Sequence, residues 1–352
     1  MLKTKIVLLV TLLCSFTFLN AQEVYEKEFI TLINEMVKDG NISSISNVGC
    51  QKGDCRVDDL VVITTDTETG VLSTLSTAVF KVKDVESFIE FKYRDGTLKE
   101  GEKRQFAIEL HDIRVDGHNL LFDKPKMAQE LGEKSELFLY FKKYLDRPSD
   151  GRYTLKVQKK SGNVIMEDSG ILTTGEFRFG IKSRYTIKGG FEKLETLSQT
   201  NPMAVLSYVV INSIEINISN PKGFLRNLLY INYKEEIQKV KTKEERIAIN
   251  NSFYLLDDTV HSQKEFGEMM RANTRIKIKE LAKKDPAFNE MLNVNQQFEK
   301  KIDAILAGTS QSIDIKIDNP LGLSLGDFFT VFMGYAMQQK LAVKPDITIS
   351  IK

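Results

Sequence analysis

The sequence has few of the residues, and none of the motifs, from which familiar catalytic and metal centres are built. Histidine occurs only three times, as His111, His118 and His261. There is no H-E-x-x-H zinc motif, no G-x-S-x-G nucleophile motif, no P-loop and no EF-hand loop. His111, Asp116 and His118 are close in sequence, but Asp116 and Gly117 favour a turn at a sheet rim over a set of metal ligands. We therefore predict a protein that is not an enzyme and holds no cofactor and no metal.

An excess of charge of one sign is also absent. The chain has 49 Lys and Arg against 48 Asp and Glu. Proteins that bind nucleic acid through its phosphates carry a basic excess, so we expect no nucleic-acid partner. The hydrophobic content of 42% is enough for a packed core and argues against global disorder.

Long apolar runs are missing outside the first residues of the chain. Lys3 and Lys5 precede an apolar segment at 6–19, and Ala21 is a small residue at which a signal peptidase can cut. This layout predicts a secretory signal peptide at residues 1–21. The segment is too short for a spanning helix, so we expect no integral membrane span after its removal. The mature protein is expected to be periplasmic or secreted.

Cysteine is scarce, and Cys14 lies inside the predicted signal peptide. The remaining pair, Cys50 and Cys55, is close enough in sequence to favour a disulfide in an oxidising compartment. Gly53 lets the short loop between them turn back. A redox-active pair more often has C-x-x-C spacing, and a metal site would need further ligands nearby. We predict a structural disulfide on a hairpin.

Helical spacing of apolar residues appears in both halves of the chain. Gly40 ends the first of these segments, Asp285 and Pro286 favour a helix start, and Gly308 favours a helix end. The predicted helices cover residues 23–38, 121–145, 234–247, 259–283 and 285–308.

Alternating patterns predict strands between these helices. Residues 85–94 alternate apolar and charged side chains, and residues 152–167 form a hairpin with a turn at Ser161 and Gly162. The alternation changes phase at His111–Asp112, which predicts a β-bulge. Residues 171–187 have one apolar and one charged side, with Gly175 or Gly180 as the place of a break. Such strands are typical of an antiparallel sheet covered on one face only.

One short segment is repeated. Residues 213–223 are SIEINISNPKG and residues 312–322 are SIDIKIDNPLG, 99 positions further on. Each copy predicts a strand with Ile on one face, and then a turn in which Asn, Pro and Gly fit positions of a type I turn. Apolar, helix-like segments precede and follow both copies, and Ser324 with Asp327 is typical of a helix cap. The repeat predicts two units that extend one sheet or pair across a pseudo-symmetric interface.

These patterns together predict the α+β class. The predicted architecture is an amphipathic antiparallel β-sheet covered by helices, with a duplicated helix-strand-turn-helix unit in the C-terminal half. Its predicted divisions are the signal peptide at 1–21, a β-rich domain with an N-terminal helix at 22–190, and a helix-rich α+β region with the repeat at 191–352.

The repeated strand and turn resemble those of AsmA-like proteins. The resemblance rests on an Ile-x-Ile strand that runs into NPKGF at 220–224 and into NPLGL at 319–323, about a dozen residues in each copy. AsmA-like proteins are β-groove proteins linked to lipid handling in the bacterial envelope. The resemblance therefore implies a groove for lipid, and it assigns no catalytic residue.

Two groups of apolar side chains are candidates for contact with a hydrophobic ligand. One lies on the predicted helix 325–337 and the other on the alternating segment 171–187. Packing onto the sheet is the commoner role of such a helix face, while Phe and Met also adapt well to irregular apolar ligands. The candidate ligand-binding residues are Phe328, Phe329, Phe332, Met333, Phe177 and Phe179.

We predict a non-enzymatic envelope protein that binds a lipid or another hydrophobic ligand in a groove on its one-sided sheet. The alternative is a scaffold or chaperone-like protein with an envelope protein as its partner, which would show an exposed apolar patch or an open strand edge. An enzyme without a local motif would instead show a cleft with several perturbed ionisable groups.

Overall fold

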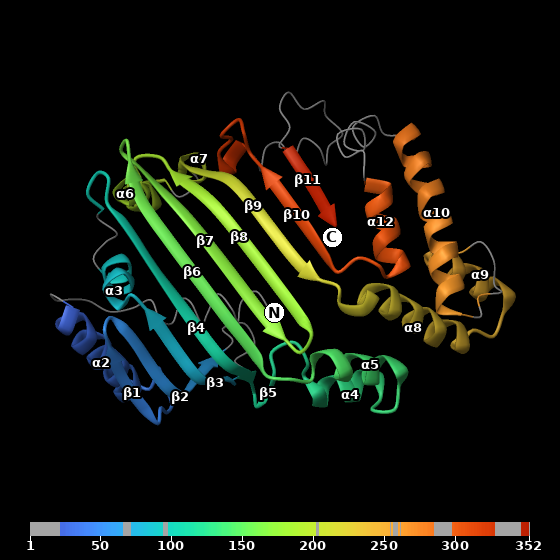
Figure 1. The fold of residues 1–352 in the computed structure, drawn as a ribbon, viewed down its shortest axis with the longest axis horizontal. Helices are drawn as coiled ribbons and strands as arrows, with labels where there is room; N and C mark the ends of the chain where they lie inside the picture. The colour runs from blue at the N-terminus through green and yellow to red at the C-terminus, as the bar shows by residue number, and fades with distance from the viewer. Residues whose placement is uncertain are drawn as a thin grey trace.

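One large antiparallel β-sheet occupies the centre of the molecule (Figure 1). The computed structural model describes residues 22–65, 72–93, 98–201, 204–253, 255, 260, 262–284, 298–327 and 346–351. The strands follow one another across the sheet in chain order, while β5 lies off this path and pairs with β4. They are β1 (Asn47–Gln51), β2 (Asp54–Thr65), β3 (Leu72–Lys83), β4 (Lys103–Val115), β5 (His118–Asn119), β6 (Ser149–Lys160), β7 (Asn163–Thr174), β8 (Phe177–Ile187), β9 (Val209–Ser219), β10 (Ser312–Asp318) and β11 (Asp346–Ile351).

Helices lie against one face of the sheet and beyond its C-terminal side, which confirms the predicted α+β class (Figure 1). The helices that lie against the first strands are α2 (Gln22–Lys38) and α3 (Val85–Tyr93), and α6 (Gly190–Thr200) lies against β7 and β8. The others are α4 (Lys124–Leu131), α5 (Glu136–Leu145), α7 (Val205–Tyr208), the short 3-10 turn η2 (Pro221–Gly223), α8 (Phe224–Lys239), α9 (Lys243–Ser252), α10 (Gln263–Lys284) and α12 (Phe298–Ala307).

The first core lies between the inward face of the early strands and helices α2 and α3. Phe80 and Val82 of β3 are both 0% exposed, and Phe80 stacks on Phe29 of α2 with ring centroids 6.4 Å apart. Phe29 and Ile33 are four residues apart and therefore point from the same side of α2. Burial of these side chains supplies the main apolar stabilisation of this end of the sheet.

The predicted strand at 85–94 is wrong, because residues 85–93 form helix α3. Val85, Phe88 and Ile89 are buried in the first core, and their spacing is helical. The helix begins after Asp84, whose carboxylate accepts a hydrogen bond from the Ser87 backbone N–H at 3.0 Å. A short alternating pattern was thus overridden by a helix start signal and by packing.

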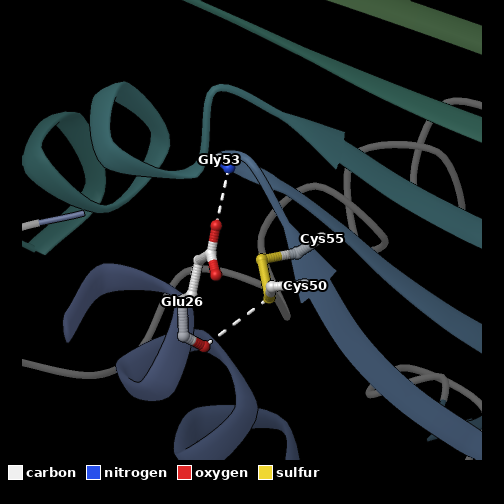
Figure 2. Close-up of a disulfide and its surroundings, with 4 residues drawn as sticks. All are labelled: Glu26, Cys50, Gly53 and Cys55. Atoms are coloured by element: carbon white, nitrogen blue, oxygen red, sulfur yellow. Dashed lines mark hydrogen bonds between the residues drawn. A yellow bond between two sulfur atoms is a disulfide. The ribbon is translucent and has the colours of Figure 1, made fainter. Parts of the chain in front are cut away.

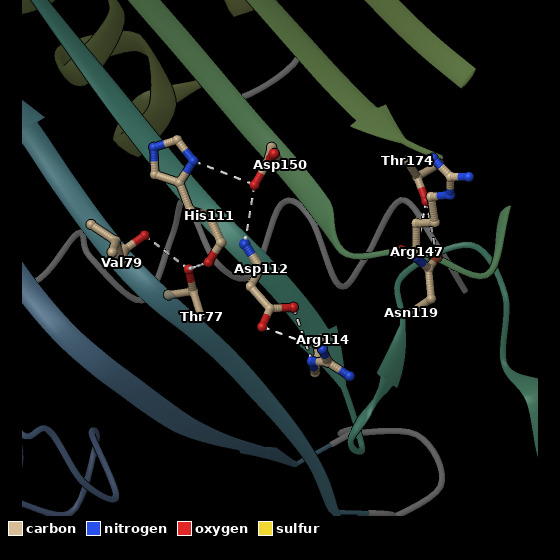
Figure 3. A network of polar contacts seen from close by, with 9 residues as sticks. All are labelled: Thr77, Val79, His111, Asp112, Arg114, Asn119, Arg147, Asp150 and Thr174. Atoms are coloured by element: carbon tan, nitrogen blue, oxygen red, sulfur yellow. Dashed lines mark hydrogen bonds and ion pairs between the residues drawn. The ribbon is translucent and has the colours of Figure 1, made fainter. Parts of the chain in front are cut away.

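The predicted bulge at His111–Asp112 is confirmed. Asp112 has a positive φ of 53°, and the register of β4 against β6 shifts between Leu110 and Ile113. The Asp112 backbone N–H donates to Asp150 of β6 at 3.1 Å, as Figure 3 shows. The bulge thereby keeps apolar side chains inward on both sides of the phase change.

The long alternating segment 171–187 is a hairpin, in which β7 and β8 are joined at Gly175 and Glu176. Gly175 has a φ of 55°, and a Cβ there would lie 1.9 Å from the carbonyl oxygen of Tyr144. The break at Gly175 thus allows the hairpin to approach the end of α5. The second predicted hairpin, with its turn at 161–162, is also present.

Most predicted helices are present with altered bounds. The segments 23–38 and 121–145 contain α2, α4 and α5, and 259–283 contains most of α10. The predicted helix 234–247 is wrong as a continuous element, because α8 ends at Lys239 and α9 begins at Lys243. Of 285–308, the described residues show α12, and the predicted signal peptide 1–21 lies outside them. The predicted domain division at 190 stays a prediction; it falls between β8 and β9, which are neighbours in the sheet.

Candidate functional site

The two copies of the repeat are neighbouring antiparallel strands, β9 and β10. Because the copies are 99 residues apart, Ile216 corresponds to Ile315, and these two residues are paired directly in the register. A local two-fold axis therefore passes through this pair, as in a symmetric dimer interface. The remaining isoleucine pairs follow the same symmetry: Ile214 with Ile317, and Ile218 with Ile313.

The asparagine of the first copy anchors the end of its strand to the start of the other copy. Asn220 is 0% exposed. Its backbone N–H donates to the Gln311 carbonyl at 2.7 Å, and its side-chain amide donates to the Ser310 carbonyl at 3.0 Å. Its side-chain oxygen accepts from the Leu225 N–H at 3.0 Å, in the first turn of α8.

The second copy makes the equivalent contacts. The Asn319 backbone N–H donates to the Asn212 carbonyl at 2.9 Å, and its amide donates to the Ile211 carbonyl at 2.8 Å. Ile211 and Asn212 lie 99 residues before Ser310 and Gln311, so the two asparagines are related by the same local axis. The repeated Asn-Pro motif is thus a reciprocal attachment between the two strands.

The type I turn prediction is wrong for the first copy. With Asn220 at position i, the central positions are Pro221 and Lys222. Lys222 has a positive φ of 51°, whereas a type I turn has negative φ at both central positions. A Cβ at Gly223 would lie 2.8 Å from the Cα of Gly308. Close approach of the chain that leads from α12 into β10 therefore requires glycine here. The predicted cap at Ser324 and Asp327 is confirmed, since the Asp327 N–H donates to the Ser324 hydroxyl at 3.2 Å.

The register places the isoleucines of the repeat on one face of the sheet, next to Ile181 of β8. We call this set the isoleucine face. Its members on β9 and β10 are half-buried, and Ile181 is 45% exposed. Among the described residues, Ile218 alone of the set belongs to a buried core. The isoleucine face comprises Ile181, Ile214, Ile216, Ile218, Ile313, Ile315 and Ile317.

Two of the predicted ligand-binding residues border this face. Phe177 is 5% exposed and packs edge-on against Phe224 of α8, with ring centroids 4.4 Å apart. Phe179 stacks on Phe177 at 5.5 Å and is the register partner of Ile218. Phe177 therefore belongs to a second core, and Phe179 lies where that core meets the isoleucine face. The buried members of the second core are Phe122, Phe138, Tyr144, Leu145, Phe177 and Phe224. A ligand-binding role for both stays a prediction, and Phe328, Phe329, Phe332 and Met333 lie outside the described residues.

One polar pair interrupts the same apolar face. Asp168 of β7 and Ser183 of β8 are register partners, and Ser183 is in turn the partner of Ile214. Ser183 is 5% exposed. Within the described part of the chain, no side chain outside the pair bonds to the buried atoms Asp168 Oδ1 and Ser183 Oγ. Burial raises the pKa of the Asp168 carboxyl, because the charged form is poorly solvated there, and the Ser183 hydroxyl beside it opposes part of this rise.

Sequence reasoning missed Asp168. The sequence does contain an indication: Asp168 occupies an apolar position of an alternating strand, because Val164 and Met166 have the same parity and pack in the first core. An acid at an apolar position of a strand is a candidate functional group because burying it unpaired is unfavourable.

The opposite face of the sheet carries a polar pocket of about 380 Å³ on β6 to β9. Arg184 and Glu167 form an ion pair across it at 3.5 Å. The charged side chains that line it are of both signs, so the pocket has no strong preference for an anion or a cation. These side chains are Lys156, Glu167, Lys182, Arg184 and Glu215. Asp168 and Ser183 also border the pocket, although strand alternation places their side chains on the isoleucine face.

The predicted disulfide between Cys50 and Cys55 is present and joins β1 to β2 (Figure 2). The Gly53 backbone N–H in the same hairpin donates to the Glu26 carboxylate of α2 at 2.6 Å. Cys55 is 0% exposed in the first core. The disulfide therefore lies in a structural setting, remote in sequence and in the sheet from the isoleucine face.

No protein-family model matches the chain, and none of the curated proteins compared with it is significantly similar. Across the described ranges, no helix has the length and apolarity needed to cross a membrane. Nor do three or more His, Cys, Asp or Glu side chains in those ranges gather in a way that could hold a metal ion.

Proposed function

We propose that this protein is a non-enzymatic periplasmic or secreted protein that binds a lipid or another hydrophobic ligand on the isoleucine face. The observation that carries the proposal is a continuous set of half-buried isoleucines on one face of β8, β9 and β10. Apolar surface of this kind marks interaction sites on soluble proteins. The signal-peptide pattern at 1–21 and the AsmA-like resemblance of the two turns support the same function.

The physical basis is the removal of apolar surface from water. Completing the burial of a half-exposed isoleucine side chain contributes roughly 1 kcal/mol. A ligand that covers several of these side chains therefore gains enough to offset part of the cost of association. A flexible acyl chain suits the surface because the side chains of β9 and β10 form rows that it can follow.

The test is to purify the protein from its own envelope fraction without detergent and to identify co-extracted lipids by mass spectrometry. Ile181→Gln changes the isoleucine face, whereas Lys182→Gln changes the next residue of the same strand, in the polar pocket. We expect a stoichiometric lipid with the unchanged protein and with Lys182→Gln, and a several-fold loss with Ile181→Gln. A clean extract from the unchanged protein, or loss with Lys182→Gln alone, would contradict the proposal.

A second candidate function is binding of an envelope protein at a sheet edge. It is favoured by the position of β11 at the end of the strand order, where the described residues pair it with β10 on one side. An open edge can accept a further strand from a partner. Cross-linking in the envelope fraction distinguishes this function, because it predicts a protein adduct on β11 and no bound lipid.

A further inference from the structure

The Asp168–Ser183 pair has the chemical character of an unfilled acceptor site. A carboxylate accepts hydrogen bonds and donates none. Both Asp168 Oδ1 and Ser183 Oγ are buried, and among the described residues no side chain outside the pair bonds to either atom, while the Ser183 hydroxyl faces the Asp168 carboxyl and partly stabilises its charged form. Buried polar atoms are normally paired, so each unpaired one is unfavourable until a partner arrives.

The surroundings of the pair are apolar on the two flanking strands. Leu155 of β6 is the register partner of Asp168 and is 2% exposed, and Ile214 of β9 is the partner of Ser183. Burial and the Asp168 charge raise the pKa of the Tyr153 phenol, which lies on the same face of β6. A group that reaches Asp168 from the isoleucine face therefore meets a negative charge at the edge of a surface that is otherwise apolar.

This arrangement selects a polar group by its charge and by its donors. A hydroxyl or a protonated amine can donate to Asp168, and a hydroxyl can also donate to Ser183 Oγ. A carboxylate or a phosphate would face like charge in a poorly solvated place. Adjacent strands lie about 4.8 Å apart, so the face offers roughly 10 Å of apolar surface from Ser183 on β8 to Ile317 on β10.

We propose that Asp168 and Ser183 form the polar subsite of the isoleucine face and hold the hydroxyl or amine end of an amphiphile whose chain lies on the isoleucines. The inference rests on the proposed function and names the class of ligand for that same site. It makes Asp168 the residue that determines specificity and the isoleucines the source of affinity.

The test compares three amphiphiles of equal chain length, dodecylamine, dodecanol and dodecanoate, below their aggregation concentrations. Each displaces the neutral fluorescent probe N-phenyl-1-naphthylamine from the purified protein at neutral pH. We expect the amine and the alcohol to bind about tenfold more tightly than dodecanoate, the ratio typical of one hydrogen bond to a charged group. Asp168→Asn keeps an acceptor but removes the charge, and it should reduce the preference of the amine over dodecanoate to about twofold or less.

Two further variants separate a binding role from a loss of folding. Ser183→Ala should weaken dodecanol about threefold or more while the amine keeps its advantage over dodecanoate. Lys182→Gln, on the opposite face, should leave all three affinities unchanged. Circular dichroism verifies that each variant is folded. If Asp168→Asn does not fold, the affinities of Ser183→Ala decide the test.

The outcomes distinguish the two proposals. Equal binding of the three amphiphiles, or an amine preference that survives in Asp168→Asn, overturns the subsite and leaves the apolar binding face in place. Failure of all three to displace the probe overturns the binding function and the subsite with it. A preference that is abolished in Lys182→Gln would assign recognition to the polar pocket and also overturn the subsite.

Discussion

The apolar face of the sheet is buried to different extents at its two ends. At β3, Phe80 and Val82 are 0% exposed beneath α2 and α3. At β9 and β10, Ile216 and Ile315 have the same alternating pattern but are only half-buried. The comparison shows that the alternation along a strand determines which side chains share a face, while the helices packed against that face determine how deeply the side chains are buried. The first end is stabilised mainly by burial, and the second depends more on the hydrogen bonds of the repeated turns.

The largest effect should come from truncating the closed end. Phe80→Ala removes a fully buried ring that stacks on Phe29, and we expect it to lower the free energy of unfolding by about 3–5 kcal/mol. Ile216→Ala should cost only about 1 kcal/mol, because the side chain is already half in water. Urea denaturation followed by circular dichroism measures both. Equal losses of stability at the two positions would contradict the inferred difference in burial between the two ends of the sheet.

An intermediate effect is expected at the two asparagines. Asn220→Ala and Asn319→Ala each leave backbone carbonyls of the other copy without their side-chain donor, so each should lower the free energy of unfolding by about 2 kcal/mol. The losses should be similar because both residues make the same two hydrogen bonds to symmetry-related carbonyls. Asn47→Ala is the control, since Asn47 is exposed on β1 and should change stability by about 0.5 kcal/mol or less. Strongly unequal losses would mean that the two turns are not equivalent in energy.

The smallest effect lies between the two ends, at Asp168. Its pKa is raised in the folded protein, so the folded state holds the proton more firmly than the unfolded state does. The contribution of Asp168 to stability is therefore most favourable at acid pH and is lost as the pH rises through the raised pKa. Asp168→Asn should be more stable than the unchanged protein at pH 7, by about 1 kcal/mol.

This advantage should shrink as the pH is lowered towards the ordinary carboxyl range. Melting curves of both proteins at matched pH values give the difference directly, since other acid effects are common to both. An advantage that is independent of pH would show that the charge of Asp168 is not the cause.

Several elements could be predicted from sequence because their signals were local. The phase change at His111–Asp112 predicted a bulge, and the helix at α2 has unambiguous spacing. The strand prediction for residues 85–94 was wrong because these side chains fit both a strand pattern and a helical face. Only the Asp84 cap and the packing in the first core distinguish the two structures. The type I prediction for the NPKG turn failed because Lys222 adopts a positive φ, and the need for glycine at position 223 depends on the close approach of Gly308, which is remote in sequence.

The candidate site depended still more on long-range structure. The repeat is evident in the sequence and predicted two units that extend one sheet or pair, but its pattern did not specify the register that pairs Ile216 with Ile315. Asp168 was hidden in an alternating strand, and its burial depends on its partners on β6 and β8. Exposure of the isoleucine face is likewise a property of the packing between distant segments.

The local axis makes the centre of the isoleucine face palindromic. An elongated molecule laid across Ile216 and Ile315 meets the same side chains whether it points one way or the other. If this face binds a ligand as proposed, duplication of the strand enlarges the binding surface without giving it a direction. Asp168 and Ser183 lie on the β7–β8 side of the axis, outside the duplicated segment. In the proposed subsite these two residues would make the two ends of the surface different, so that Asp168, which the repeat does not copy, would set the orientation of a bound amphiphile.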